Sequence, residues 1–253
     1  MSLLHSLSSI AVALSGCALD VPPAEPTFDD GRPAVTLYQV QDPTADGHPD
    51  VGTNVRVEDL VVTAVDRFDE DGSGKTGTVF VQEIDGGPWS GIQLYRPAVQ
   101  PASEYLLPGD VVEVEGQYVE FDLGQINPAW ADATGRTISQ VANGVVRKTG
   151  EWISPEPALI DDPADLQEDP AAESWEGVLV EMRDVDVTRA RDSYGAFQVT
   201  GGALVDDDNY QIPNPAVGDH FVRVAGVSTY LAAEYKVLPR SALDVTGGPA
   251  AQE

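Results

Sequence analysis

The chain has 253 residues and carries 42 Asp and Glu against 14 Lys and Arg, a formal net charge of −28 at pH 7. A surface this acidic repels nucleic-acid phosphates and anionic lipid headgroups, so the composition argues against nucleic acid as a partner. The hydrophobic content of 42% favours a globular fold. The single cysteine, Cys17, excludes an internal disulfide.

The N-terminal segment predicts export. Residues 1–17 contain no acidic residue and an apolar run, Ile10–Leu14, that is too short to span a bilayer and is typical of a signal peptide. The segment ends in Leu14-Ser15-Gly16-Cys17, which resembles a bacterial lipobox. That resemblance implies lipidation of Cys17, and Ala18 after it implies an outer-membrane or cell-surface lipoprotein, mostly periplasmic or extracellular. The alternative is an ordinary signal peptide with a chance cysteine.

The segment that follows looks like a tether. Residues 18–34 contain four prolines and four acids, with little to bury. We predict a disordered, acidic, Pro-rich tether over residues 18–50.

The remaining chain consists of short β-type runs separated by Gly, Pro, Asp and Asn, without a long amphipathic helix. An internal repeat is visible, because Val55–Val65 aligns with Val180–Ala190 at a shift of 125 residues. In both copies the apolar alternation slips by one residue, which predicts a β-bulge that bends a long first strand. Such a strand is typical of a five-stranded Greek-key barrel.

The predicted fold is therefore all-β, with two tandem OB-like Greek-key barrels. The first barrel takes residues 51–150 and the second 176–247, with a linker at 151–175 and a disordered tail at 248–253. Short strands are expected at Gly77–Gln82 and Tyr194–Val199, and β runs at Pro108–Gly116 and Val217–Gly226 that end at glycine. A further aromatic-containing strand is expected after each of these glycines, and Thr149–Gly177 is expected to include one helical turn.

These residues also carry a family resemblance. The order VGTNVRVEDLVVTAV, VFVQE, SGIQLY and PGDVVEVEG, over about residues 51–127, is similar to the OB-fold-like accessory domain of bacterial extracellular nucleases. The resemblance implies a β-barrel module in an exported protein. It does not imply nuclease activity, because no nuclease catalytic domain accompanies it.

The stretch DEDGSGKTG, Asp69–Gly77, has three interpretations. A P-loop is excluded because Asp69 occupies the position of its first glycine and a strand-like run follows. Asp69, Asp71 and Ser73, followed by Gly74, match the first half of a calcium loop. Phe80, however, stands where that loop has a bidentate Glu. Asp66, backbone carbonyls or a neighbouring loop would therefore have to supply the remaining ligands. The other interpretation is a solvated hairpin tip. The second repeat is seven residues shorter here, so this region is an insertion in the first copy only.

Other chemistry is sparse. Asp206–Asn209 and Asp42–Asp50, with the dipeptide Asp46-Gly47, are predicted turns with a secondary calcium interpretation. His220 is a predicted strand residue, and no zinc set or catalytic triad pattern is present. Trp130, Trp152 and Trp175 flank the linker, and we expect them to pack between the barrels or, alternatively, to stack a sugar or a base.

The sequence thus predicts a non-enzymatic, lipid-anchored tandem binding module for a protein, a glycan or a cation-bridged ligand. A structural or assembly component of the envelope is the alternative, and a divergent hydrolase that uses surface carboxylates is a third hypothesis. Calcium is the one cofactor that the pattern suggests.

Overall fold

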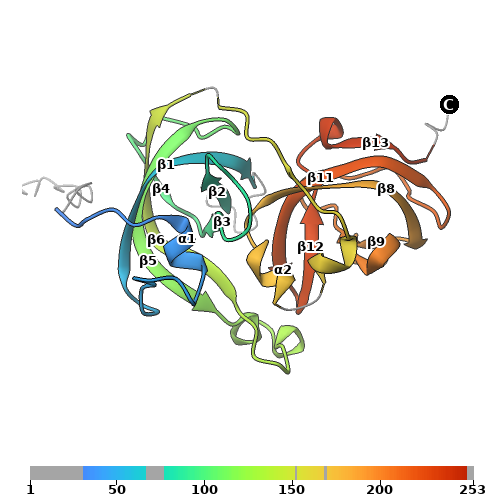
Figure 1. The fold of residues 1–253 in the computed structure, drawn as a ribbon, viewed down its shortest axis with the longest axis horizontal. Coiled ribbons are helices and arrows are strands. Elements are labelled where there is room, and N and C mark those ends of the chain that lie inside the picture. The colour runs from blue at the N-terminus through green and yellow to red at the C-terminus, as the bar shows by residue number, and fades with distance from the viewer. Residues whose placement is uncertain (1–30, 67–76, 152, 168–169, 250–253) are drawn as a thin grey trace, which may run out of the picture. The chain divides into compact units, whose positions relative to one another are not determined.

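The computed structural model describes residues 31–66, 77–151, 153–167 and 170–249, and every structural statement below concerns these residues (Figure 1). The strands form two sheets, and the only α-helices in the described residues are short, so the predicted all-β fold is confirmed. The helices are α1 Leu37–Gln41 and α2 Ala171–Ser174, with 3-10 turns at Leu123–Gln125, Pro128–Trp130, Pro163–Leu166, Thr200–Gly202 and Ala242–Asp244.

The N-terminal sheet contains β1 Asn54–Val65, β2 Val79–Glu83, β3 Gly91–Leu94, β4 Ala98–Gln100, β5 Val111–Phe121 and β6 Ile138–Gly150. Its strand order is β3-β2-β1-β5-β6-β4, and β3 also pairs with β6. Five strands therefore form a closed ring of pairings, β1-β2-β3-β6-β5, in which the β3–β6 pair is parallel and the β1–β2 and β1–β5 pairs are antiparallel.

The C-terminal sheet repeats this arrangement. It contains β7 Ala158–Leu159, β8 Leu179–Arg189, β9 Phe197–Val199, β10 Leu204–Val205, β11 His220–Leu231, β12 Glu234–Leu238 and β13 Val245–Gly247. The order β13-β11-β12-β10-β9-β8-β7, with an added β11–β8 pairing, again closes five strands into a ring, β8-β9-β10-β12-β11. The β10–β12 pair of this ring is parallel.

The predicted bulge is confirmed in β1 but not at the corresponding place in β8. The β1–β5 register shifts between Val57 and Leu60, where Glu58 and Asp59 are both exposed between buried neighbours. In β8, Arg183 and Asp184 are likewise exposed between Met182 and Val185, which are buried, but the register against β11 continues past them without a shift. The register of β8 shifts only against β9, between Val187 and Arg189. In β1 the slip lets the apolar side of the strand remain buried on both sides of the bend.

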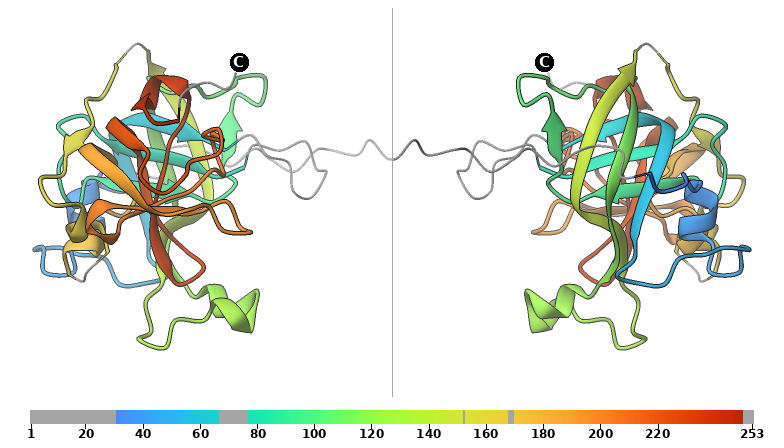
Figure 2. Two further views of the ribbon diagram at one scale, coloured as in Figure 1. Left: turned by 90° about the vertical axis from the view of Figure 1, so that its right-hand side faces the viewer. Right: turned by 90° about the vertical axis from the view of Figure 1, so that its left-hand side faces the viewer.

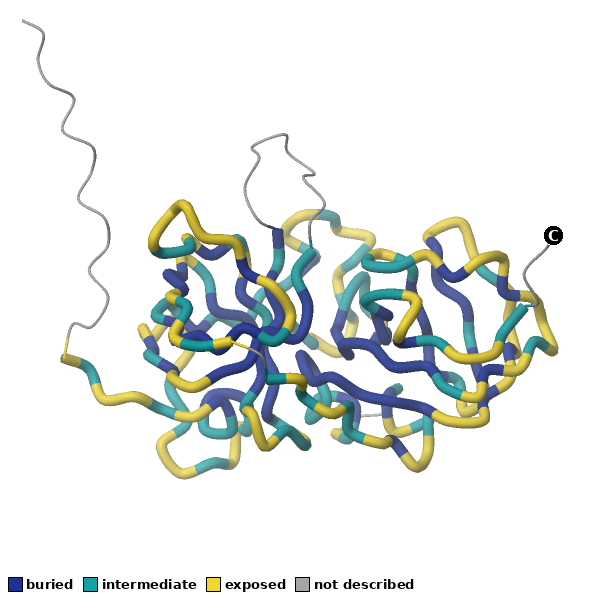
Figure 3. Tube along the Cα trace, turned by 90° about the horizontal axis from the view of Figure 1, so that it is seen from above, coloured by how far each residue is buried: buried dark blue, intermediate teal, exposed yellow. Residues whose placement is uncertain are grey.

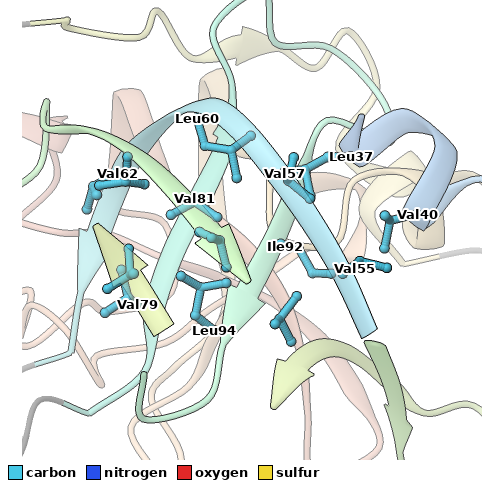
Figure 4. Close-up of a cluster of buried hydrophobic side chains, with 14 of the residues drawn as sticks. Leu37, Val40, Val55, Val57, Leu60, Val62, Val79, Val81, Ile92 and Leu94 are labelled. Atoms are coloured by element: carbon cyan, nitrogen blue, oxygen red, sulfur yellow. The ribbon is translucent and has the colours of Figure 1, made fainter. Parts of the chain in front are cut away.

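The interior of the N-terminal ring is aliphatic (Figure 4). Strands β1, β2 and β3 supply half of its buried side chains, and Leu37 and Val40 of α1 pack against them with no exposed surface. A capping box between Thr36 and Gln39 starts α1. Residues 37–41, which the sequence analysis assigned to the tether, thus form part of the folded core.

The two long strands β5 and β11 differ from prediction in one respect. Each was expected to end at a glycine and to be followed by a separate strand, but β5 runs through Gly116 and β11 through Gly226. A Cβ on Gly116 would lie 2.4 Å from Cγ1 of Val141, and one on Gly226 would lie 2.5 Å from the Leu238 carbonyl carbon. These glycines therefore mark close packing inside a continuous strand.

The segment between β5 and β6 extends beyond the ends of these strands (Figure 2). Trp130 in this segment packs with Phe121 and Leu231 around a cluster that contains Tyr230 and Tyr235 of the C-terminal sheet. Trp175 instead packs against the core of the C-terminal sheet, and Trp152 lies outside the described residues. The expectation of packing between the two halves is confirmed for Trp130. Figure 3 shows buried positions along the strands and exposed positions mainly in the connections.

Candidate functional site at the junction of the two sheets

The two sheets meet in an apolar contact, called the junction here. Ala64 and Phe80 of the N-terminal sheet form one buried cluster with Leu179, Val227 and Leu238 of the C-terminal sheet. Burial of these side chains stabilises the docked arrangement through the hydrophobic effect.

Backbone atoms also touch across the junction at a pair of glycines. A Cβ on Gly91 would lie 2.2 Å from the carbonyl carbon of Gly177, and a Cβ on Gly177 would lie 2.5 Å from the Ile92 nitrogen. Only residues without a side chain permit this approach.

Hydrogen bonds cross the junction as well. The Leu179 backbone amide donates to Oε1 of the buried Gln82 at 3.0 Å. The Trp89 amide donates to the Ser174 carbonyl at 2.6 Å. These bonds satisfy groups that the contact removes from water, so the two sheets are held in one arrangement.

A pocket of about 410 Å³ opens at the junction. Its walls come from the end of β1, the turn before β5, the loop after β10 and the segment after β12. The residues that line it are Ala64, Val65, Asp66, Pro108, Asp208, Asn209 and Arg240. Three strand ends and a turn thus bring two carboxylates, an amide and a guanidinium to one hollow.

The positive charge in the pocket wall is already neutralised. Arg240 forms a two-point ion pair with Asp244, with Nε–Oδ2 at 2.8 Å and Nη2–Oδ1 at 2.7 Å, and Nη1 donates to the Thr63 carbonyl at 3.1 Å. Burial alone would raise the pKa of Asp244, but the hydrogen bonds and charge of Arg240 outweigh it and lower that pKa. Arg240 therefore fastens the junction and adds little net charge to the pocket.

The loop after β10 carries three consecutive carboxylates, Asp206, Asp207 and Asp208, whose oxygens lie within 4.8 Å of one another. Asp206 is buried and pairs with Lys236, with Nζ–Oδ2 at 2.8 Å, while its Oδ1 has no hydrogen-bond partner. Asp207 pairs with Arg191 at 3.3 Å. Two members of this triplet are therefore held by basic side chains.

Asp208 differs from its two neighbours, because no hydrogen bond or ion pair reaches it from the residues that the structure describes. It is exposed as a residue, yet partial burial of its carboxyl group raises its pKa to about 6, with further contributions from the charges of Asp206, Asp207 and Asp66 and opposition from Lys236. The charged groups around the Asp208 carboxyl group thus carry more negative than positive charge. Beside it, Nδ2 of Asn209 is buried without a partner.

The residues that the sequence singled out fall in several places. Cys17 and the calcium-loop residues Asp69, Asp71 and Ser73 lie outside the described residues, but Asp66, which precedes that loop, lines the pocket. The predicted turn at Asp206–Asn209 is confirmed as an irregular loop and supplies the other pocket carboxylate.

The remaining predicted positions take no part in the pocket. Residues 42–50 form turns in which Oδ1 of Asp42 accepts from the Thr44 amide at 2.8 Å. His220 lies on β11 with a half-exposed side chain that contacts Asp186 at 2.8 Å. Its predicted place on a strand is confirmed.

Arg240 and Asp244 were not identified from the sequence. They lie four residues apart around a 3-10 turn that Ser241 caps, and the pair gives no motif that identifies it in a chain with 42 acids. Their position at the pocket follows from the junction, which sequence periodicity does not reveal.

No family model, curated protein or solved structure matches this chain. Within the described residues, no helix has the length and apolar character needed to cross a membrane.

Proposed function

We propose that this protein is a non-enzymatic binding module of the cell envelope, a lipoprotein anchored at Cys17 with two tandem OB-like barrels. Two observations support the barrel assignment. Each sheet closes five strands into a ring, and each ring begins with a long strand whose register against the next strand shifts once. A five-stranded Greek-key barrel built in this way is a common support for ligand-binding loops.

The pocket at the junction is the proposed binding site. Its volume of about 410 Å³ lies in the range of ligand pockets, and its lining combines apolar walls with a few convergent polar groups. The observation that carries the proposal is the contrast between Arg240, which Asp244 neutralises, and Asp208, which has no hydrogen-bond or ion-pair partner among the described residues.

This contrast predicts that the ligand presents positive charge to the pocket. A cationic group placed beside Asp208 relieves the repulsion from Asp206, Asp207 and Asp66, so it is favoured over a neutral or anionic group. The ligand is accordingly a protein that presents a basic side chain, or a glycan bound through a bridging cation. The acidic surface of the whole chain accelerates the approach of such ligands.

Calorimetric titration tests this function with two probes, a pentalysine peptide and an acidic oligosaccharide in the presence of calcium, at a salt concentration of about 150 mM. We expect one probe to bind saturably, and Asp208→Asn to weaken it about tenfold. Asp161→Asn is the matched control, because Asp161 is exposed between β7 and the 3-10 turn Pro163–Leu166 and does not line the pocket. Equal effects of the two substitutions, or no saturable binding, would contradict the proposal.

A structural or assembly role in the envelope is the second candidate. The observation that favours it is the buried junction, in which Gly91 and Gly177 touch and hold the two sheets at a fixed spacing. Copurification with one envelope complex, unchanged by Asp208→Asn and without binding of either probe, would support this role instead.

A further inference from the structure

A buried carboxylic acid, Glu176, lies at the junction and is independent of the pocket. It sits between α2 and β8 and precedes Gly177, the residue that touches Gly91 and Ile92 of the N-terminal sheet. Glu176 is 3% exposed, and neither of its carboxyl oxygens has a hydrogen-bond partner in the part of the chain that the structure describes. A carboxyl group in such a position is costly unless it is neutral.

The groups around Glu176 make its ionised form less favourable still. The charges of Glu173 in α2 and Glu120 in β5 both raise the pKa of Glu176. The charge of Glu176 in turn raises the pKa of Tyr118 in β5. The Ser139 backbone in β6 acts in the other direction and lowers the pKa of Glu176. It is not placed well enough to give either Glu176 oxygen a hydrogen bond.

The nearby hydroxyl groups are already committed to the other two acids. Tyr235 of β12 donates to Glu173 at 2.5 Å, while Glu120 accepts from Tyr118, from Thr137 at 2.6 Å and from Ser139 at 2.7 Å. The basic side chain in the adjoining network, Arg136, pairs with Asp132 at 2.7 Å. None of the groups that act on the Glu176 carboxyl group by charge is a cation.

Burial, followed by repulsion from Glu173 and Glu120, raises the pKa of Glu176 well above its ordinary value. In the unfolded chain the same group ionises near its ordinary pKa, about 4.3. The folded protein therefore retains a proton on Glu176 that the unfolded chain releases.

We propose that Glu176 is a proton-dependent latch, such that the two sheets dock fully only while its carboxyl group is protonated. Protonation of Glu176 removes one buried negative charge from a site that also holds Glu173 and Glu120. Ionisation places that charge next to the backbone contact between Gly91 and Gly177, where the least costly response is separation of the sheets and entry of water.

The pH dependence follows from this arrangement. Since the folded pKa is raised, the stabilisation from a protonated Glu176 is complete below the unfolded pKa and is lost as pH rises through the folded pKa. A protonated Asp208 also contributes stability at low pH, but this contribution is lost as pH rises through its pKa of about 6. A loss of docking that continues above pH 6 is therefore the signature of Glu176.

Hydrogen exchange on the intact folded chain tests the latch. The reporters are the amides of Leu179 and Trp89, which donate across the junction. The controls are the Val62 amide, which donates to Asp110 within the N-terminal half, and the Val187 amide, which donates to Asp219 within the C-terminal half. Rates are corrected for the intrinsic effect of pH on exchange.

In the wild-type protein we expect the protection of Leu179 and Trp89 to fall about tenfold between about pH 6 and 9, with little change at the controls. Glu176→Gln has nearly the same shape and no charge, so the protection of the reporters should become independent of pH. Glu176→Leu, a second variant without a titratable group, should behave alike. Equal pH dependence in wild type and Glu176→Gln, or loss of protection at reporters and controls together, would overturn the proposal.

Discussion

Asp59 of β1 and Asp184 of β8, aligned by the 125-residue repeat, share a left-handed backbone, with φ of 54° at Asp59 and 50° at Asp184. Both residues are exposed, and Asp59 lies at the register shift between β1 and β5. Aspartate tolerates this conformation better than most residues, because its short polar side chain bonds locally. The repeat has therefore kept the left-handed backbone at this position as well as the apolar pattern around it.

The backbone at Asp59 predicts a clear order of variants. Asp59→Val should reduce the free energy of unfolding by about 1–2 kcal/mol, because a β-branched residue is strained at positive φ. Asp59→Gly should cost much less, since glycine adopts this conformation freely. Urea denaturation measures both, and a valine variant as stable as the glycine variant would show that the left-handed backbone is not required.

The bend could be predicted from sequence because it leaves a signature in the order of residues. Val57 and Leu60 are buried on either side of two exposed residues, so the alternation of apolar residues reports the bulge directly. Gly116 and Gly226 were harder to interpret, since a glycine can end a strand or permit close packing within it, and only the neighbouring side chains distinguish the two. α1 was missed because five residues are too few to show a helical period.

The contact between Gly91 and Gly177 predicts that a single methyl group disturbs the junction. In Gly91→Ala the new Cβ would lie 2.2 Å from the Gly177 carbonyl carbon, so the backbone must move, at a cost of about 1–3 kcal/mol. Gly144→Ala is the matched control in the same sheet, because its Cβ would have no neighbour closer than 3.4 Å. Thermal unfolding compares the two, and equal melting temperatures would argue against a tight junction.

The buried ion pair between Lys236 and Asp206 predicts a strong asymmetry between single and double variants. Their side chains are 6% and 2% exposed, so Asp206→Asn leaves a buried ammonium without its counterion and should cost about 3–5 kcal/mol. The double variant Asp206→Leu/Lys236→Met removes both charges and should recover most of that loss. Denaturant titration of the three proteins measures the coupling, and a double variant less stable than Asp206→Asn would contradict this account.

The candidate site could be predicted only in part. Asp206–Asn209 was identified as an acidic turn because Asp and Asn cluster between two β runs, but neither its basic partners nor Arg240 follow from local pattern. Lys236 comes from β12, about thirty residues from Asp206 in the chain, and only the parallel pairing of Val205 with Val237 brings the two together. Long-range pairing of this kind has no signature in a single sequence.

The lipobox predicts that Cys17 anchors the protein. Cys17→Ser removes the thiol that lipidation requires, so the variant should leave the membrane fraction and appear in the soluble fraction after cell lysis. Ala18→Ser is a control that retains the cysteine. The measurement is immunoblotting of separated fractions, and equal membrane association of Cys17→Ser and wild type would rule out the anchor.

The spacing of Asp69, Asp71 and Ser73 predicts a weak calcium site. Because an ion that binds only the folded state stabilises it, calcium at about ten times its Kd should add about 1.4 kcal/mol and raise the melting temperature by a few degrees. The double variant Asp69→Ala/Asp71→Ala should lose this response. Asp208→Asn is the control and should keep it, because Asp208 lies in the other half of the chain and not in the insertion that carries the calcium pattern. Loss of the response in Asp208→Asn alone would move the ion to the Asp206–Asp208 triplet, and a wild-type protein without any calcium response would exclude both sites.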